Sequence, residues 1–315
     1  MRAVTIVDQH IEVRDHPDPE PAKGEVLVRV RAAGLNRADL MQVQGFYPAP
    51  PGSPPDIPGL ELAGEVAATG PGVTAFTAGD RVAALVGGGA QADLAVVHER
   101  MAMPLPASVD WPEAGGFPEV FLTAHDALFT QARLTIGERV LVHGAAGGVG
   151  TAAVQLAAAA GARVTASVRD PDLWHGVREL GADDVVAHDD FAGHGPFDVV
   201  LELVGAVNVA ANLEALARGG RIVVIGVSAG AQAEVDLFAI MHKRAVITGS
   251  TLRARPLEEK ATVTRRAEAH VLPLLEAGLI RVPLAQTYAL EDSPGAYERF
   301  AQGGKLGKIV LSMGD

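Results

Sequence analysis

The sequence predicts an α/β protein in which a β-rich domain precedes a doubly wound parallel sheet. Residues 1 to about 117 contain many short apolar strand candidates and no long helix. From about residue 120 to 253, strand and helix candidates alternate, which is the pattern of a parallel sheet. The chain has 315 residues, more than one hydrophobic core usually serves, so two domains are expected.

The first predicted domain, residues 1–119, is a compact, barrel-like arrangement of short strands separated by turns rich in glycine, proline and aspartate. Its strand candidates are Val4–Val7, Val26–Val30, Gly64–Ala68, Arg81–Leu85 and Ala92–Val97.

A glycine-rich turn organises the second predicted domain. The apolar run Val140–Val142 leads into the turn Gly144–Gly150, and a helix follows over Val149–Ala160. A strand, a tight turn and a helix start form a phosphate cradle, because free N–H groups and the helix dipole point at the anion. The first position of the GxGxxG fingerprint holds Ala145, and a plain strand-to-helix connection is the alternative. The flanking strand and helix favour a dinucleotide.

Residues 120–253 supply the six strands that a doubly wound dinucleotide-binding sheet needs. The strand candidates are Val140–His143, Val164–Val168, Asp184–Ala187, Val199–Glu202, Ile222–Gly226 and Ala245–Thr248. The helix candidates between them are Val149–Ala160, Pro171–Leu180, Val207–Ala217 and Val235–His242. Gly226 ends a strand at the carboxyl edge of the sheet, where such sheets bind ligands.

The last segment, residues 254–315, is expected to return to the first domain. It contains one helical pattern, Leu257–Ala277, and two short strand candidates, Thr287–Leu290 and Lys308–Leu311, on either side of a helix at Pro294–Phe300.

The composition excludes several classes of function. The net charge of −12 argues against a nucleic-acid or anionic membrane partner, which requires clustered Lys and Arg. The chain has no cysteine, which excludes disulfides, thiolate metal sites and a cysteine nucleophile. No signal-peptide core or membrane-spanning apolar run is evident, so a cytoplasmic location is expected.

The residues after the second strand of the parallel sheet bear on the choice of dinucleotide. An acid there accepts hydrogen bonds from the ribose of NAD, whereas an arginine pairs with the 2′-phosphate of NADP. Arg169 favours NADPH. Asp170 leaves two alternatives open, because it could be the acid that binds NAD or the N-cap of the helix that starts at Pro171.

Two further stretches invite a functional interpretation. Gly34–Asp39 ends a strand and starts a short helix, and Asp39 is expected to brace this region by hydrogen bonds, as is Glu61. Gly45–Gly52 is a proline-stiffened loop in which Tyr47 is either held for function or merely packed. His143 is interpreted as a packed or hydrogen-bonded residue rather than an acid or base.

Together these segments resemble the medium-chain dehydrogenase/reductase superfamily, in its zinc-free quinone oxidoreductase branch. Within the branch, the chain looks most like the tumour-suppressor-inducible NADPH quinone oxidoreductase type. The resemblance extends over nearly the whole chain. The matching segments are Ala33–Asp39, Pro58–Gly64, Leu122–Ala124, His143–Gly150, Glu179–Asp183 and Gly307–Leu311.

The resemblance implies a GroES-like catalytic domain followed by a Rossmann domain, with the active site in the cleft between them. Zinc-dependent relatives bind their metal through Cys, His and Cys. Here Asn36 stands at the first cysteine position and Leu60 at the histidine position, so a zinc-independent reaction is expected.

The resemblance also implies the residues of the cofactor site. Main-chain contacts to the pyrophosphate would come from Ala146, Gly147, Gly148 and Val149. Thr123 would lie near the nicotinamide, and Arg169 and His188 at the adenosine end. Ser250, Thr251, Leu252 and Lys308 would close around the cofactor, while Asn36 and Tyr47 would face the nicotinamide and the substrate.

The expected reaction is hydride transfer from C4 of NADPH to a quinone, with no zinc. The Asn36 amide and the Tyr47 hydroxyl would stabilise the negative charge on the acceptor oxygen, and Tyr47 or water would supply the proton. The alternatives are an NADPH-dependent alkenal or enone (enoyl) reductase and, in another class, a non-catalytic NADPH-binding protein. The apolar edge strand Ala245–Gly249 and the resemblance predict a homodimer.

Overall fold

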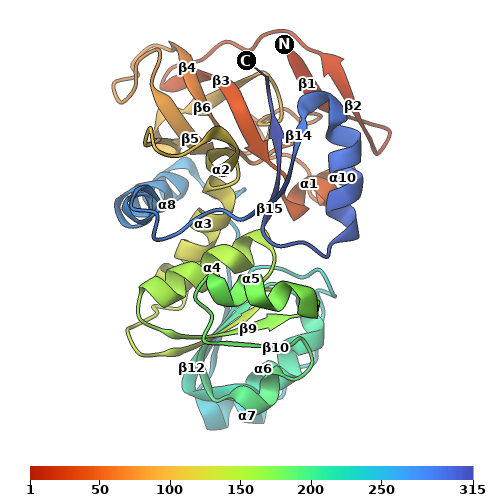
Figure 1. The fold of residues 1–315 in the computed structure, drawn as a ribbon, viewed down its shortest axis with the longest axis vertical. Coiled ribbons are helices and arrows are strands. Elements are labelled where there is room, and N and C mark those ends of the chain that lie inside the picture. The colour runs from red at the N-terminus through yellow and green to blue at the C-terminus, as the bar shows by residue number, and fades with distance from the viewer. Residues whose placement is uncertain (315) are drawn as a thin grey trace. The chain divides into compact units, whose positions relative to one another are not determined.

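The computed structural model describes residues 1–314 and divides into two compact units. Unit 1 comprises Met1–Leu122, Leu252–Gly304 and the chain from Lys308 onward. Unit 2 comprises Thr123–Thr251 and Lys305–Gly307. Figure 1 shows both units, coloured by residue number from red at the N-terminus to blue at the C-terminus. The predicted fold class is confirmed, because a β-rich unit and a parallel-sheet unit are both present.

Unit 1 is built around a seven-stranded sheet in which β3 is central. The strands are β3 (Glu25–Gly34), β4 (Glu61–Thr69), β5 (Arg81–Leu85), β6 (Leu94–His98), β7 (Ala102–Pro104), β14 (Leu284–Ala289) and β15 (Lys308–Ser312). The C-terminal strand β15 pairs antiparallel with β3, with Val310 opposite Gly34. Strand β15 therefore lies directly beside the end of β3.

A separate hairpin and several helices complete unit 1. The hairpin joins β1 (Arg2–Val7) and β2 (His10–Asp15). The helices are α1 (Arg37–Val43), α2 (Trp111–Gly115), α8 (Leu257–His270), α9 (Leu272–Glu276) and α10 (Ser293–Gln302), and α3 (Pro118–His125) continues into unit 2. The single helix predicted over Leu257–Ala277 is broken, because Pro273 cannot donate an N–H to continue α8 and instead lies in the first turn of α9.

Unit 2 contains a six-stranded, fully parallel sheet with the strand order β10-β9-β8-β11-β12-β13. The strands are β8 (Arg139–His143), β9 (Arg163–Val168), β10 (Asp184–Ala187), β11 (Phe197–Glu202), β12 (Leu216–Val224) and β13 (Val246–Gly249). This is the doubly wound order of a dinucleotide-binding fold.

Helices cover both faces of the sheet in unit 2. In Figure 1, α4 (Gly148–Ala159) and α5 (Trp174–Glu179) lie on one side, and α6 (Val209–Ala215) and α7 (Leu237–Lys243) on the other. A core cluster under α6 includes Leu141, Val200 and Leu213, all at most 3% exposed. Because both faces are buried, the central strands consist of continuous apolar runs.

Two local predictions in unit 2 need correction. The helix predicted at Val207–Ala217 is a 3-10 turn at Ala206–Asn208 followed by α6, which ends at Ala215. Strand β12 then begins at Leu216, six residues before the predicted start at Ile222. Strand β12 starts early because of a tertiary contact. Leu216 is 1% exposed and pairs with Phe197 of β11, which extends the strand to this residue.

Among residues 1–314, every helix is too short or too polar to cross a membrane.

The glycine turn yields a test of the fold. A Cβ atom on Gly150 would lie 2.4 Å from the carbonyl oxygen of Gly144, whereas a Cβ on Gly147 would meet nothing nearer than 3.4 Å. We predict that Gly150→Ala lowers the unfolding free energy of the cofactor-free protein by about 1–3 kcal/mol, because backbone atoms must move. Gly147→Ala is the matched control and should stay close to wild type. Equal urea midpoints for the two variants would contradict this packing.

Candidate functional site

The predicted phosphate turn lies at the carboxyl end of β8. The Gly147 N–H donates to the Gly144 carbonyl (3.0 Å), which closes the turn, and the Thr151 N–H donates to the Gly147 carbonyl (2.8 Å), which opens α4. The N–H groups of Gly148 and Val149 precede that first helical bond and have no acceptor within the helix. They can therefore bind an anion at the positive end of the helix dipole.

A second backbone segment borders this turn. Gly307 donates its N–H to the Ala146 carbonyl (2.8 Å) and forms a bridge with Gly147. Both residues belong to unit 2. This bond links the Lys305–Gly307 segment to the glycine turn.

Arg169 and Asp170, the two residues that bear on the choice between NADPH and NADH, make different contacts in the structure. Asp170 accepts a hydrogen bond from the N–H of Asp172 (3.1 Å) and caps the 3-10 turn Pro171–Leu173. Arg169, directly after β9, is exposed and makes no ion pair within residues 1–314. His188 follows β10 and is also exposed, and its Nδ1 atom lies 3.8 Å from the Asp189 carboxylate.

Other predicted residues of unit 2 follow strands β12 and β13 or lie on α3. Gly226 comes just after β12, and a Cβ atom there would lie 2.5 Å from the Leu203 carbonyl, so packing alone requires glycine. Ser250 donates its N–H to Val224 (3.1 Å) and its hydroxyl to Asp126 (2.9 Å). Thr123 on α3 is 8% exposed, whereas Thr251 is exposed.

In unit 1, Asn36 and Lys308 form the centre of a buried polar cluster. The Lys308 ammonium group donates to the Leu35 carbonyl and to Asn36 Oδ1, both at 2.7 Å, and lies 2.6 Å from Glu61 Oε1. Asn36 Nδ2 donates to the same Glu61 oxygen (2.8 Å). Lys308 and Glu61 are 2% and 0% exposed, so the ion pair is shielded from water. Leu252, also assigned to unit 1, is buried as well.

Asp39 braces the start of α1 in the same cluster. Its carboxylate accepts hydrogen bonds from the N–H groups of Asn36 (2.7 Å) and Gly59 (3.2 Å). Burial raises the pKa of Asp39 to about 6, and the Asn36 N–H and the Lys308 charge oppose that rise. The expected bracing role of Asp39 agrees with these contacts.

Tyr47 is held by an arginine that the sequence did not single out. Arg253 donates to the carbonyl oxygens of Tyr47 (2.9 Å) and Gly87 (2.8 Å), and also to Gln42 Oε1. Its guanidinium carbon lies 5.1 Å from the centre of the Tyr47 ring. Burial raises the pKa of the Tyr47 hydroxyl, which remains a hydrogen-bond donor at neutral pH. The only sequence signal for Arg253 is its position after the predicted Ser250–Leu252 segment.

Glu119 is a second residue that the sequence analysis missed. It lies in the first turn of α3, and its N–H donates to Glu61 Oε2 (2.8 Å). Burial raises the pKa of the Glu119 carboxyl to about 8, the neighbouring Glu61 charge adds to the rise, and Lys308 opposes it. The one indication in the sequence was that Glu119 precedes the predicted site residue Thr123 by four residues, one helical turn.

His143 belongs to a buried network at the strand ends of unit 2. Its Nε2 atom lies 2.7 Å from Asn212 Oδ1, and Asn212 Nδ2 donates to Glu202 (2.7 Å). Burial lowers the pKa of His143, and the Glu202 charge opposes that change. The network satisfies buried polar groups, in agreement with the structural interpretation of His143.

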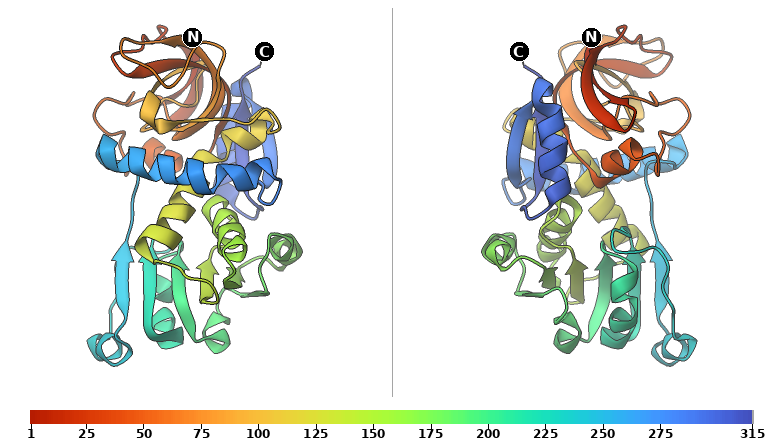
Figure 2. Two further views of the ribbon diagram at one scale, coloured as in Figure 1. Left: turned by 90° about the vertical axis from the view of Figure 1, so that its left-hand side faces the viewer. Right: turned by 90° about the vertical axis from the view of Figure 1, so that its right-hand side faces the viewer.

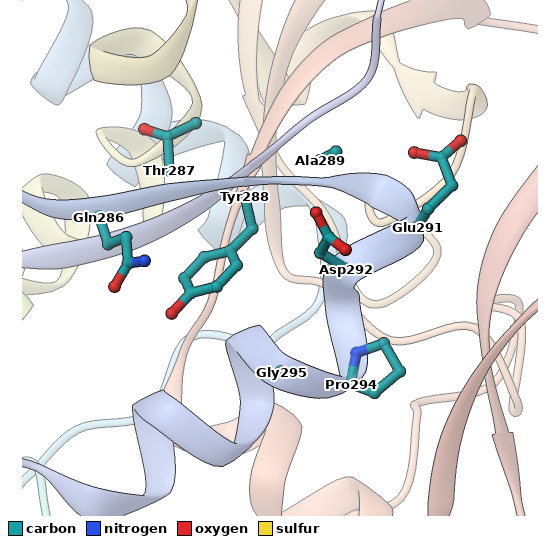
Figure 3. A pocket seen from close by; sticks show the side chains of 8 residues that line it. All are labelled: Gln286, Thr287, Tyr288, Ala289, Glu291, Asp292, Pro294 and Gly295. Atoms are coloured by element: carbon teal, nitrogen blue, oxygen red, sulfur yellow. The ribbon is translucent and has the colours of Figure 1, made fainter.

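Two other features lie apart from these sites. Within residues 1–314, no group of three or more His, Cys, Asp or Glu side chains is arranged to hold a metal ion. An open groove lies between β14 and α10, and Figure 3 shows Tyr288, Asp292 and Pro294 among its lining residues. The groove shares no residue with the glycine turn or the Lys308 cluster.

Comparisons with known proteins agree with this architecture. Residues 22–107 match the alcohol dehydrogenase GroES-like domain, and residues 148–268 match the zinc-binding dehydrogenase family. The chain is 32% identical to a quinone oxidoreductase of Rattus norvegicus, over 93% of the chain and 90% of that protein. It is 31% identical to the Homo sapiens quinone oxidoreductase, over 99% and 97%. A solved quinone oxidoreductase of Pseudomonas syringae is 28% identical with a TM-score of 0.87, and 99% of each chain is covered.

Part of a much larger protein is also similar. The chain is 37% identical to the spectinabilin polyketide synthase protein NorB of Streptomyces orinoci, over 94% of the chain but only 14% of that protein. It likewise spans 5% of the polyketide synthase GfsB of Streptomyces halstedii.

The fold and the glycine turn thus define a two-unit protein in which a GroES-like unit is joined to a parallel-sheet unit of the dinucleotide-binding type. The chain belongs to the quinone oxidoreductase-like medium-chain dehydrogenase/reductase family, which confirms the resemblance found in the sequence.

The buried ion pair yields a test of the unit 1 cluster. We predict that Lys308→Met lowers the unfolding free energy at neutral pH by about 3–5 kcal/mol, because it leaves Glu61 buried without its counter-charge. Adding Glu61→Gln should recover part of that loss, and denaturant unfolding would measure both. Arg100→Met, at the exposed pair with Glu258, is the surface control and should stay near wild type. Strictly additive losses in the double variant would contradict the coupling.

Proposed function

We propose that this protein is an NADPH-dependent, zinc-independent reductase that transfers a hydride from nicotinamide C4 to a quinone. The observation that carries the proposal is the Lys308 ammonium group, which binds the oxygens of Asn36 and Glu61. Asn36 stands where zinc-dependent relatives have a metal-binding cysteine. A fixed cation already neutralises this donor set, and the chain has no cysteine thiolate to complete a zinc site.

The proposed cofactor site uses the main chain of unit 2. The free N–H groups around Gly148 and Val149 suit a pyrophosphate, and Gly147 leaves open the space that a Cβ would fill. The bound nicotinamide would supply the hydride, and the protein would orient it and exclude water. Contacts from Ala146, Thr123, Gly226, Ser250, Thr251, Leu252 and Lys308 remain part of the proposal.

The preference for NADPH is supported by the two residues that follow β9. The Asp170 carboxylate is occupied as a cap, whereas the Arg169 guanidinium is exposed and has no ion-pair partner within residues 1–314. An unpaired guanidinium suits a 2′-phosphate, because it can donate two parallel hydrogen bonds to it. We propose that Arg169 and the neighbouring His188 bind that end of the cofactor.

Asn36 and Tyr47 have different roles in this proposal. The Asn36 amide already donates to Glu61 and, weakly, to Gly34 (3.4 Å), so it positions Lys308 and Glu61 rather than stabilising an oxyanion. The Tyr47 hydroxyl has no hydrogen-bond partner within the described chain and can donate to the acceptor oxygen, where negative charge develops. Arg253 holds the Tyr47 backbone in place for that contact.

A second candidate function is reduction of an enone, alkenal or enoyl group by NADPH. It is favoured by the polyketide synthase relatives, which are 36–37% identical to the chain. A non-catalytic NADPH-binding protein is the alternative of another class. The cytoplasmic location stays a prediction of the sequence.

Three acceptors separate these functions in one experiment. Consumption of NADPH and of NADH is followed with 9,10-phenanthrenequinone, a simple benzoquinone and a 2-alkenal. We expect turnover with NADPH and faster reduction of the quinones. Faster alkenal reduction would favour the second candidate, and binding of NADPH without any turnover would favour the third.

Arg169→Ala tests the basis of the cofactor preference. We predict that it weakens NADPH binding about 10- to 100-fold, because a charge-assisted contact is lost, and leaves NADH binding unchanged. Titration calorimetry with both cofactors would measure the effect. Arg163→Ala, at the exposed start of β9, is the control for general loss of charge. Equal weakening of NADPH and NADH would count against a 2′-phosphate contact.

We also propose a homodimer through the edge of the parallel sheet. Strand β13 is at one edge of the sheet (Figure 2), and its Val246 and Ile247 are 51% and 39% exposed. Leu237, Phe238 and Met241 of α7 are each more than 70% exposed. An exposed apolar strand edge pairs readily with a copy of itself across a two-fold axis.

The homodimer predicts a solution mass near twice 32.6 kDa. Val246→Glu should shift the protein to monomer in light scattering, because it places two like charges at the two-fold axis. Ile136→Glu, at another exposed apolar position of unit 2, is the control and should leave the dimer intact. A wild-type monomer would refute the proposal.

A further inference from the structure

The hydrogen bonds of the unit 1 cluster leave one carboxyl group available for chemistry. Glu61 Oε1 is bound by Asn36 and Lys308, and its Oε2 by the Glu119 N–H. Both oxygens of Asp39 accept backbone N–H groups. The side chain of Glu119 is partly exposed, and its carboxyl makes no hydrogen bond or ion pair within residues 1–314.

The position of Glu119 is fixed even though its carboxyl is free. Its backbone N–H is tied to Glu61 (2.8 Å), which is itself held by Lys308. The charges that act on the carboxyl come from four surrounding elements: Glu61 on β4, Lys308 on β15, Asp39 on α1, and Arg253 after β13. Glu119 in turn acts on Tyr47 in the neighbouring loop. A partly exposed carboxyl that has no partner within residues 1–314, and whose charge acts on the proposed oxyanion donor, is well placed to exchange protons.

We propose that Glu119 is the general acid that supplies the proton completing the reduction. This inference rests on the proposed reductase function in its second form, the reduction of an enone or alkenal. An enone that accepts the hydride at its β-carbon gains a C–H bond and becomes an enolate, with the electron pair of the former double bond shared with oxygen. The Glu119 O–H bond then breaks, its proton passes to the enolate, and the resulting carboxylate takes a proton from water. The sum is NADPH, one proton and enone giving NADP⁺ and the saturated carbonyl compound.

The protonation state of Glu119 is consistent with this role. With a pKa of about 8, the carboxyl is protonated at neutral pH and can act as an acid. Because only the protonated form donates, the rate limited by proton transfer should fall as pH rises above about 8. Asp39, with a pKa of about 6, is ionised at neutral pH and cannot replace Glu119 as the acid.

The experiment measures kcat for a 2-alkenal with saturating NADPH from pH 6 to 10. We expect Glu119→Gln to lower kcat roughly 100-fold at pH 7 and to abolish the decline above about pH 8. Glu119→Asp should have a higher kcat than Glu119→Gln and should again show the decline in kcat at alkaline pH. Tyr47→Phe should lower kcat but keep the decline, because it leaves the acid in place.

Glu113→Gln is the matched control. Glu113 lies on the neighbouring α2, and its side chain is also partly exposed. Its carboxylate accepts a hydrogen bond from the Val282 N–H (2.8 Å), outside the cluster. This variant should keep the wild-type rate and pH profile. NADPH affinity should be unchanged in Glu119→Gln, and its thermal midpoint should match wild type near pH 4.5, where the wild-type carboxyl is protonated in the folded protein. These two measurements separate lost chemistry from lost structure.

Stability provides a readout that does not depend on turnover. The folded pKa of Glu119, about 8, exceeds its ordinary value of 4.5, so the folded protein binds more protons than the unfolded chain between these pH values. The unfolding free energy of wild type should therefore fall relative to Glu119→Gln as pH rises from about 4.5 to 8. No relative change would overturn the proposed protonation state.

The outcomes separate this inference from the function it rests on. Wild-type turnover with an unaltered rate and pH profile in Glu119→Gln would overturn the role of Glu119 alone. Loss of the alkaline decline in Tyr47→Phe but not in Glu119→Gln would assign the proton to Tyr47 and also overturn it. Wild-type turnover with quinones but none with the alkenal would overturn this inference alone, and absence of turnover with every acceptor would overturn both.

Discussion

The ammonium group of Lys308 is the contact on which the organisation of unit 1 depends. It joins the C-terminal strand β15 to the end of β3, through the Leu35 carbonyl and the Asn36 amide, and to Glu61 at the start of β4. An ion pair this deeply buried is stable only when further hydrogen bonds satisfy both charges, and here they do. Together with the strand pairing, these contacts hold β15 beside the end of β3.

In the proposed function, the cluster would allow this fold to support a reduction without zinc. A lysine ammonium carries one positive charge and only donates hydrogen bonds, so it can orient Asn36 and Glu61 but cannot polarise a substrate as a Lewis acid does. An acceptor that is already electrophilic, such as a quinone or an enone, needs less polarisation. The same fold therefore hosts different reactions through a few side chains.

The two units contribute different kinds of groups. Unit 2 offers backbone N–H groups at a glycine turn, which depend on main-chain geometry and tolerate many side chains around them. Unit 1 offers specific side chains whose charges are balanced against one another. In the proposed function, binding of the cofactor phosphates rests on the first kind and selection of the acceptor on the second.

The sequence alone determined the parts whose causes are local. Strands β5 and β10 were predicted with their observed bounds, and the glycine turn was identified because each of its signals lies within about twenty residues. Asn36, Tyr47 and Lys308 were selected from a resemblance, without their partners.

Only the tertiary structure decided which groups meet. Lys308 and Asn36 are 272 residues apart, and Arg253 lies 206 residues from Tyr47, so no periodicity or spacing connects them. Glu119 carries no motif of its own. Its availability becomes apparent only once the hydrogen-bond donors to Glu61 and Asp39 are identified. The start of β12 at Leu216 likewise depends on its pairing with Phe197. Local patterns specify elements, whereas burial and hydrogen bonding between distant residues specify the candidate site.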